Sequence, residues 1–259
     1  MRHAEIIDAL LIAAAGAFLT AGVLWLARRA RAGRALAAVG WGLATALLAL
    51  NSWLAQAPPF GNMYQVQVLL ALCFLPASLL LRTRGPFGWT APYFAFASAV
   101  PLIGALFLDK DIGWRRMPAL QSAWFVPHVT AYMIAYSFAA VAFALTLVRL
   151  VRRRPDSDSH AAAAREVVRL SFPFMTFGLL SGALWADLAW ASYWSWDPKE
   201  TWSLITWLLY ASYLHIPPRS HLRRLADGVQ FLAFAALLVT FIVVNLAPRF
   251  VSPLHGYAR

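Results

Sequence analysis

The sequence predicts an all-α protein that crosses a membrane about eight times. Three observations lead to this fold class: an apolar composition, a series of long apolar runs and an ordered distribution of positive charge. Of the 259 residues, 61% are apolar and 13% are charged, and the mean hydropathy is +0.62. Soluble domains are about 45–50% apolar and about 25% charged. Because a soluble chain of this composition could not cover its surface with polar groups, we expect the bilayer to be its solvent.

Eight apolar runs are long enough to be considered as membrane-spanning helices, which need about 20 residues to cross a hydrocarbon core about 30 Å thick. The runs cover residues 6–27, 36–57, 64–81, 90–108, 124–148, 168–190, 201–216 and 226–247. No internal repeat is evident, so we expect a single membrane domain over residues 1–259. Residues 152–164 are charged and rich in Ser and Ala, and we expect them to be a loop.

The positive charges indicate how the spans are oriented. Fifteen of the 22 Lys and Arg residues follow spans one, three, five and seven: Arg28, Arg29, Arg31, Arg34, Arg82, Arg84, Arg149, Arg152, Arg153, Arg154, Arg165, Arg169, Arg219, Arg223 and Arg224. Basic loops stay on the cytoplasmic side of a membrane. We therefore expect both termini outside, together with residues 58–63, 109–123, 190–200 and the carboxyl-terminal tail.

The net charge of +11 raises the question of nucleic-acid binding. The basic residues lie in short clusters between apolar runs, and none of them carries a recognisable nucleic-acid-binding motif. Such clusters fit cytoplasmic loops beside anionic lipid. We therefore expect membrane lipid, and no nucleic acid, as a partner. The one cysteine, Cys73, lies in an apolar run and has no partner for a disulfide, a metal site or a redox pair.

Residues 185–207 are the most informative segment, because they hold half of the chain's 12 tryptophans. These six are Trp185, Trp190, Trp194, Trp196, Trp202 and Trp207. Trp and Tyr gather at membrane interfaces, so an interfacial belt explains any one of them. A belt does not explain six at one hairpin. We therefore expect an external Trp-rich loop at about residues 185–202, suited to a flat, apolar and polarisable ligand.

Residues 197–200, with the sequence DPKE, have the pattern of a helix start. Asp is favoured at the N-cap, Pro at the first helical position and Glu three residues after the cap. Asp197 and Glu200 are therefore expected to begin the seventh span and to set the angle of the loop before it. Residues 193–196 then form a short aromatic platform between two helix ends. Lys199, in the first turn, can meet an acidic group on the rim of the ligand.

The Trp-rich segment resembles the WWD segment of haem-handling proteins in cytochrome c maturation. Its WDPKETW form is similar to that of the CcsA (ResC) family of the system II synthase, rather than to the CcmC and CcmF proteins of system I. Further matches are residues 58–64, which end in NMY, residues 118–129, which read PALQSAWFVPHV, and residues 254–258, which read LHGYA. The resemblance covers nearly all of the chain and keeps the family's order and topology.

The resemblance implies a function in the bacterial inner membrane. Members of the family bind haem, here expected to be haem b, and present it extracytoplasmically for attachment to the Cys-x-x-Cys-His motif of apocytochrome c. The haem is expected to arrive through an intramembrane site shared with a CcsB (ResB) type subunit, whose large extracytoplasmic domain this chain lacks. Such a subunit of a cytochrome c synthase (haem lyase) acts by binding and orienting haem. No catalytic residue is expected, and whether to call it an enzyme stays open.

Two histidines, His128 and His255, are expected outside, on the side of the Trp-rich loop. A lone histidine is more often a hydrogen-bonding residue than a ligand, and the residues alone leave both interpretations open. The family's two external haem-ligating histidines match these positions, so the resemblance implies bis-imidazole ligation, which leaves no open iron position. We expect the haem also to contact the loop, through Trp185, Trp190, Trp194, Trp196, Asp197, Lys199 and Trp202.

His215 lies too far from that site to share its haem. Seventeen helical steps of about 1.5 Å from Pro198 place it about 26 Å further along the axis. A snorkelling interfacial histidine is one interpretation. The resemblance implies another, because the family has a haem-iron ligand here, in the same YLH context, towards the cytoplasmic side. The sequence offers no convincing second intramembrane histidine, so the other ligand is expected from the CcsB-type subunit.

Two other classes of function remain as alternatives. A haem-containing membrane electron-transfer protein normally pairs histidines between facing spans. The spans of this chain hold too few histidines for such pairs. A small-molecule transporter commonly has inverted repeats with paired broken helices, and no such pattern occurs here.

Overall fold

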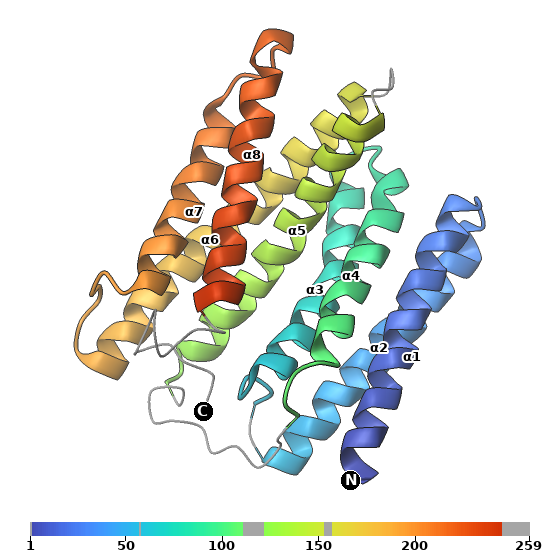
Figure 1. Ribbon diagram of the computed structural model, residues 1–259, viewed down its shortest axis with the longest axis vertical. Helices are drawn as coiled ribbons and strands as arrows, with labels where there is room; N and C mark the ends of the chain where they lie inside the picture. Colours follow the sequence, from blue (N-terminus) through green and yellow to red (C-terminus); the bar gives the residue numbers. More distant parts are fainter. Residues whose placement is uncertain (1, 57, 111–121, 153–156, 245–259) are drawn as a thin grey trace. The chain divides into compact units, whose positions relative to one another are not determined.

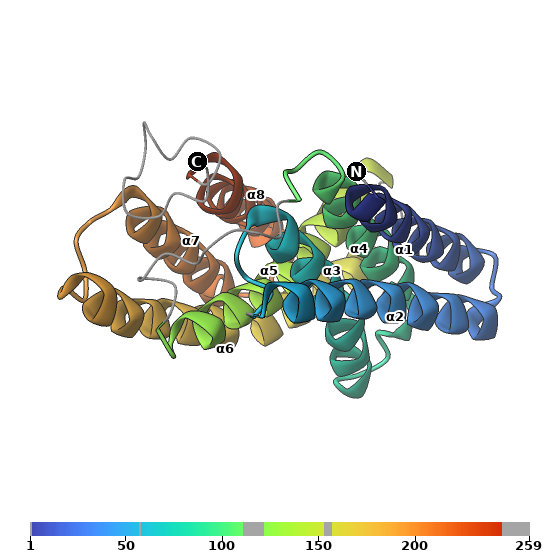
Figure 2. The same cartoon turned by 90° about the horizontal axis from the view of Figure 1, so that it is seen from below.

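The computed structural model describes residues 2–56, 58–110, 122–152 and 157–244. In these ranges the chain forms helices and no strands, which confirms the all-α fold class. The chain divides into two compact units, Met1–Arg116 and Met117–Arg259, and each is described by itself (Figures 1 and 2). The expectation of one membrane domain over the whole chain stays a prediction.

The described part of unit 1 contains the helices α1 (Arg2–Leu26), α2 (Ala30–Ala55), α3 (Met63–Thr83) and α4 (Ala91–Ala105), with the short 3-10 helix η1 (Gly88–Thr90) before α4. Helix α1 packs against α2 and α4, and α3 packs against α4 and α2. Small residues let these helices approach each other closely, as is common in membranes. A Cβ at Gly40 of α2, for example, would lie only 3.2 Å from the backbone oxygen of Ala14 in α1.

The NMY segment of unit 1 is a helix start. The side chain of Asn62 caps α3 by accepting a hydrogen bond from the backbone nitrogen of Gln65 at 3.0 Å. The side-chain oxygen of Gln65 accepts in turn from the backbone nitrogen of Gly61 at 2.8 Å. Tyr64 is fully buried, and its hydroxyl accepts a hydrogen bond from the side chain of Asn51. The bond between Asn51 and Tyr64 joins α2 to α3.

The described part of unit 2 contains α5 (Phe125–Arg152), α6 (Ser157–Trp190), α7 (Pro198–His215) and α8 (Arg223–Leu238), with the 3-10 helix η3 (Ser220–Leu222) before α8. Helix α8 continues as a π-helical segment, η4 (Val239–Val243). Helix α5 packs along α6, and α7 packs along α8. We call the end of unit 2 that carries the α6–α7 connection the loop end, and the opposite end, with the α7–α8 connection, the arginine end (Figure 1).

The expected loop over residues 152–164 is wrong for most of its length. Arg152 is the last residue of α5, and residues 157–164 form the first turns of α6. Four consecutive alanines, at 161–164, explain the difference, because Ala has the highest helix propensity of all residues. Asp158 lies in the first turn of α6, where a negative charge stabilises the helix dipole.

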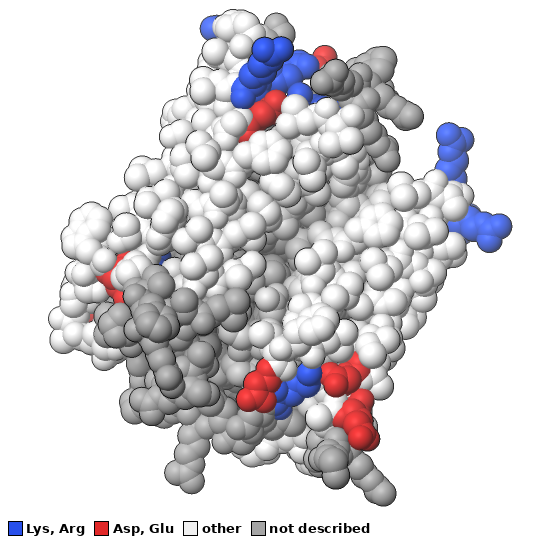
Figure 3. Space-filling view, viewed as in Figure 1, with Lys and Arg blue, Asp and Glu red and all other residues white. Residues whose placement is uncertain are grey.

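Six of the described helical segments are long and apolar enough to cross a membrane, which shows a multi-pass membrane protein. They are Ala4–Leu26, Ala30–Ala55, Met63–Thr83, Phe125–Val151, Asp158–Trp190 and Arg223–Val243. Helix α4 has 15 residues, about 23 Å of rise, which is short for a core about 30 Å thick. The number of spans and the location of the termini outside stay predictions. On the face in Figure 3, charged side chains lie at the helix ends of each unit.

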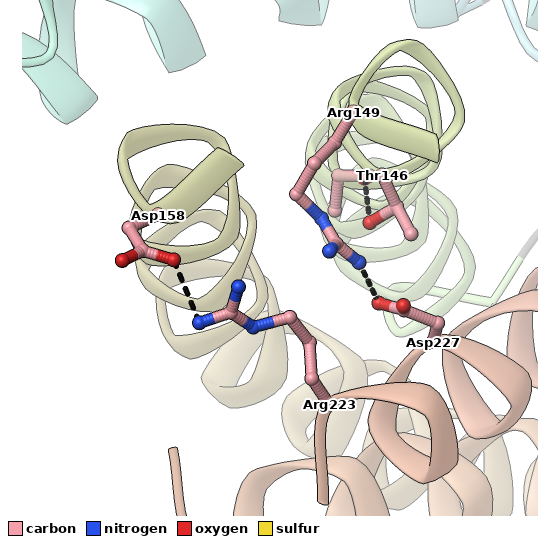
Figure 4. Close-up of polar contacts among 6 residues, drawn as sticks. Thr146, Arg149, Asp158, Arg223 and Asp227 are labelled. Atoms are coloured by element: carbon pink, nitrogen blue, oxygen red, sulfur yellow. Dashed lines mark hydrogen bonds and ion pairs between the residues drawn. The ribbon is translucent and has the colours of Figure 1, made fainter. Parts of the chain in front are cut away.

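A buried ion pair joins α5 to α8 near the arginine end. The guanidinium of Arg149 contacts the carboxylate of Asp227, and only 7% and 15% of these side chains are exposed (Figure 4). A second pair, between Arg223 and Asp158, has a length of 2.6 Å and leaves 77% of the Asp158 side chain exposed. A buried charge is costly unless it is paired. Removing one partner of the Arg149–Asp227 pair should therefore destabilise the chain far more than removing one partner of the more exposed Arg223–Asp158 pair.

We expect Arg149→Met to destabilise the chain by about 3 kcal/mol or more, because it leaves the Asp227 carboxylate buried and unpaired. The double variant with Asp227→Leu should recover most of that loss. Thermal unfolding in detergent measures both effects. Asp158→Asn is the matched control and should cost less than about 1 kcal/mol. A double variant as unstable as Arg149→Met alone would contradict this account.

Candidate functional site

His128 lies near the start of α5, at the loop end, and its imidazole contacts α6. Its Nδ1 lies 2.8 Å from the backbone oxygen of Gly178. A carbonyl oxygen can only accept a hydrogen bond, so Nδ1 carries the proton and, in the neutral ring, Nε2 carries the lone pair. The ring stacks on Trp185, with centroids 5.5 Å apart, and meets Tyr132 edge-on at 5.1 Å. These contacts hold the imidazole in one orientation.

Trp185 and Trp190 pack beside His128. Only 5% of Trp185 is exposed, and its ring lies 5.4 Å from that of Phe125 and 4.9 Å from that of Trp190. Trp190 is half-buried and is the last residue of α6. The sequence grouped both tryptophans with the external loop. The structure places Trp185 between α5 and α6, where it forms one wall around the imidazole.

Residues 191–197, here called the aromatic loop, join α6 to α7. Trp196 is 68% exposed and Tyr193 is 58% exposed, whereas Trp194 is half-buried. The rings of Trp194 and Trp196 meet at 87°, with centroids 5.7 Å apart. Aromatic pairs favour this edge-to-face arrangement because ring edges are positive and ring faces are negative. The two rings therefore form a corner.

The indole nitrogen of Trp194 is buried, and it has no hydrogen-bond acceptor among the described residues. Leaving a buried N–H donor without an acceptor costs about 1–3 kcal/mol. A group outside the described residues that accepts from this nitrogen would recover that free energy. The aromatic loop thus contains a donor suited to an acceptor on a ligand.

The start of α7 confirms the predicted helix-start pattern. Asp197 is the N-cap, and its side chain accepts a hydrogen bond from the backbone nitrogen of Lys199 at 2.9 Å. Glu200 completes the capping box and accepts from the backbone nitrogens of Ser195 at 2.8 Å and Asp197 at 3.2 Å. These bonds tie the aromatic loop to the first turn of α7. Trp196 lies between the two bonded residues, Ser195 and Asp197. Its backbone φ is 60°, which is a costly conformation for a residue other than glycine.

Lys199 places a positive charge beside the aromatic loop. The residue is half-buried in the first turn of α7. Burial lowers its pKa from 10.5 to about 8, and the negative charge of Asp197 acts in the opposite direction. The amine is therefore mostly charged at neutral pH and loses its proton as the pH rises through about 8.

Helix α7 separates His215 from the aromatic loop. The helix runs from Pro198 to His215, so the two lie about 26 Å apart along its axis. His215 is exposed, and its Nδ1 lies 2.7 Å from the backbone oxygen of Ala211. Its neutral ring therefore also carries the lone pair on Nε2. The structure brings His128 together with Trp185, which contacts Trp190, and leaves His215 at the arginine end.

Two tryptophans of the segment lie within α7. Trp202 is half-buried in the second turn. Trp207 donates a hydrogen bond from Nε1 to the hydroxyl of Thr176 at 2.9 Å and stacks on Phe172. Trp207 therefore packs α7 against α6, a structural role that distinguishes it from the exposed Trp196.

The sequence analysis missed two features of unit 2. Arg165, treated there as a loop residue, lies on α6 and donates to the backbone oxygens of Leu214 at 2.6 Å and Ile216 at 2.8 Å. These carbonyls flank His215, at a helix end where carbonyls lack helical partners. The other feature is the pair Gly178 and Gly182, on the face of α6 that meets His128. The GxxxG spacing of these two glycines in the sequence could have indicated a close contact between α6 and another helix.

His255 lies in residues 245–259, outside the described residues, as do residues 118–121 of the PALQSAWFVPHV segment. The expected approach of His255 to His128 therefore stays a prediction. The same holds for the roles of the other candidate haem-binding residues.

Residues 31–252 match the family described as Cytochrome C assembly protein. The chain belongs to this family. Among proteins of the cytochrome c assembly family, Cytochrome c biogenesis protein CcsA of Synechococcus sp. (strain CC9902) is 32% identical over 257 residues, which cover 82% of this chain and 83% of the relative. CcsA of Mesostigma viride is 32% identical, with 77% of each chain covered. CcsA of Chlamydomonas reinhardtii is 44% identical, over 58% of this chain and 40% of the relative.

A solved structure of Cytochrome c Heme Lyase CcmF has a similar fold, with a TM-score of 0.66 and 22% identity. The match covers 96% of this chain and 47% of that protein, so this chain spans about half its length. Membership of the cytochrome c assembly family confirms the predicted family and assigns this chain to cytochrome c biogenesis. His128, the aromatic loop and His215 lie within the matched residues, whereas His255 lies beyond them.

We expect Asp197→Asn to leave the stability nearly unchanged and Asp197→Ala to cost about 1 kcal/mol, because Asn caps helices about as well as Asp and Ala does not. Thermal unfolding in detergent measures the difference. Asp187→Ala, in the last turns of α6, is the matched control and should change stability by less than about 0.5 kcal/mol. An Asn variant as unstable as the Ala variant would show that the charge itself is required.

Proposed function

We propose that this chain binds haem b at the loop end of unit 2 and presents it for covalent attachment to apocytochrome c. It would be the CcsA-type subunit of a system II cytochrome c synthase in the bacterial inner membrane, with the loop end extracytoplasmic. The observation that carries the proposal is the fixed imidazole of His128, with its lone pair on Nε2, at the end of unit 2 that also carries the aromatic loop.

The residues at the loop end suit a haem. Histidines that ligate a metal through one ring nitrogen commonly donate the other ring N–H to a carbonyl or carboxylate, as His128 does. Trp196 exposes an aromatic surface on which a porphyrin can stack. The two propionates of a haem need donors and cations, and the buried indole N–H of Trp194 and the ammonium of Lys199 supply them.

His255 is the proposed second external ligand. Helix α8 runs towards the loop end, and η4 ends at Val243, 12 residues before His255. A chain of that length can span at most about 40 Å, so His255 can lie up to that distance from the end of η4. His128 and His255 would then together hold the haem iron.

The bound haem would supply vinyl groups that form thioether bonds with the two cysteine thiols of the apocytochrome motif. The residues of this chain bind and orient. His128 and His255 hold the iron, the aromatic loop stacks on the ring, and Lys199 neutralises a propionate. No side chain of the chain need act as a general acid or base.

We also propose an entry position for haem at the arginine end, centred on His215. The exposed imidazole has its lone pair on Nε2, and Arg165 holds the backbone oxygens on either side of it. One histidine cannot complete bis-imidazole ligation, so a CcsB-type partner subunit would supply the second ligand. The proposed entry position at His215 would then lie about 26 Å along α7 from the aromatic loop, where haem is presented.

The haem content and ligand spectrum of the complex with a CcsB-type subunit test the proposal. His128→Ala and His255→Ala should each lower external haem by about tenfold or more, because an axial ligand is lost, and should lower cytochrome c maturation with it. Excess imidazole should partly restore both the external haem and the cytochrome c maturation of these variants. His221→Ala, which removes an exposed histidine of η3, is the matched control and should change neither.

In the same experiment, His215→Ala should lower haem loading of the complex and should have no effect on the chain without its partner. If His128→Ala and His255→Ala both keep a full bis-imidazole spectrum and normal maturation, the external site is wrong. Two haems bound by the isolated chain would contradict the shared entry position.

Haem retention should weaken as pH rises through about 8, because Lys199 then loses the proton that attracts a propionate. Binding an anion raises the pKa of this amine, so haem binding takes up a proton and affinity falls by no more than about tenfold per pH unit. In Lys199→Arg the guanidinium stays charged, and retention should be flat between about pH 7 and 10. Coincident pH profiles of the wild type and Lys199→Arg would rule out this role.

A further inference from the structure

Two glycines of α6 lie where the side chain of His128 meets that helix. Gly178 and Gly182 are one helical turn apart, in the sequence GLLSG. A Cβ at Gly182 would lie 2.6 Å from Cε1 and 2.8 Å from Nδ1 of His128. Both distances are shorter than any tolerable contact between such atoms. The imidazole therefore occupies the volume that a side chain at residue 182 would fill.

Gly182 also leaves a hydrogen-bond acceptor accessible. In an α-helix the Cα–Cβ bonds tilt towards the N-terminus, so the side chain of residue i+4 lies over the carbonyl of residue i. Gly178 and Gly182 have this spacing. Because residue 182 has no Cβ, the backbone oxygen of Gly178 can be reached from α5, and Nδ1 of His128 donates to it at 2.8 Å.

Two aromatic rings also contact the imidazole in this notch. Trp185 stacks on one side of the imidazole with an interplanar angle of 29°, and Tyr132 meets it at 90°. The ring of Tyr132 packs against Gly178, since a Cβ at that glycine would lie 3.1 Å from three of the ring atoms. A shift of the His128 ring towards either neighbour would therefore require Trp185 or Tyr132 to move.

We infer that Gly182 and the Gly178 carbonyl form a positioning notch that selects the Nδ1–H tautomer of His128 and so places the lone pair on Nε2. Both are positioning residues, since they act through His128. A carbonyl that accepts from the other ring nitrogen orients a histidine ligand and raises its basicity. The consequence for haem rests on the proposed function of His128, but the tautomer itself is a property of the haem-free chain.

Nitrogen NMR of the haem-free chain, labelled at histidine, tests the notch without haem. The His128 signals, identified by their loss in His128→Ala, should show a neutral ring protonated on Nδ1. Gly182→Ala should shift these signals towards the Nε2–H tautomer. Gly228→Ala on α8 is the matched control, because a Cβ there meets nothing within 4 Å. A wild-type ring protonated on Nε2, or signals unchanged by Gly182→Ala, would overturn the inference.

A second experiment leaves residue 182 intact, in case Gly182→Ala does not fold. His128→Ala vacates the ring volume, which added 4-methylimidazole or 1-methylimidazole can fill. The two compounds are equal in size and both can ligate iron, but only 4-methylimidazole can ligate and still donate an N–H to the Gly178 carbonyl. Haem retention should be restored about tenfold better by 4-methylimidazole, the factor expected for one hydrogen bond.

Equal rescue by the two compounds would overturn the notch. If His128→Ala itself leaves haem retention unchanged, the proposed function of His128 fails instead. The NMR result then still decides whether the notch sets the tautomer.

Discussion

Hydrocarbon offers no hydrogen bonds, and this constraint governs unit 2. Helices satisfy their own interior backbone groups, so only helix ends and polar side chains need other partners. Three side chains near the proposed sites bond to the backbone of a neighbouring element. Glu200 accepts from the aromatic loop, Arg165 donates to the last carbonyls of α7, and His128 donates to the carbonyl of Gly178. The bonds that satisfy polar groups in the membrane therefore also place the side chains of the proposed site.

The two proposed iron ligands among the described residues, His128 and His215, are held by different means. Nδ1 of His128 donates to α6, so its position depends on how α5 and α6 pack. Nδ1 of His215 donates to Ala211 of its own helix, so its ring moves with the end of α7. Arg165 fixes that end against α6. Helix α7 acts as a spacer that is held at both ends, with a capping box at one and an arginine at the other.

Asp197 and Lys199 are two residues apart, and the structure gives them different roles. Asp197 is buried and its carboxylate is used as a helix cap. The amine of Lys199 is desolvated and lies close to its titration point at neutral pH, where an anionic ligand would stabilise its charged form. In the proposed function, Asp197 is therefore a structural residue and Lys199 contacts the ligand.

The sequence by itself determined the all-α fold class, the start of α7 and the family, because each of these depends on local pattern. A long apolar run becomes a helix wherever the backbone must satisfy its own hydrogen bonds, and Asp197 and Glu200 form a capping box from their spacing alone. Only the tertiary structure decided that Trp185 is interior, that Trp194 and Trp196 meet at a corner, and that Gly182 makes room for His128. The apolar pattern of a membrane helix does not specify which face meets which neighbour, since lipid and protein interior are equally apolar. That choice depends on the shapes of facing side chains from distant segments.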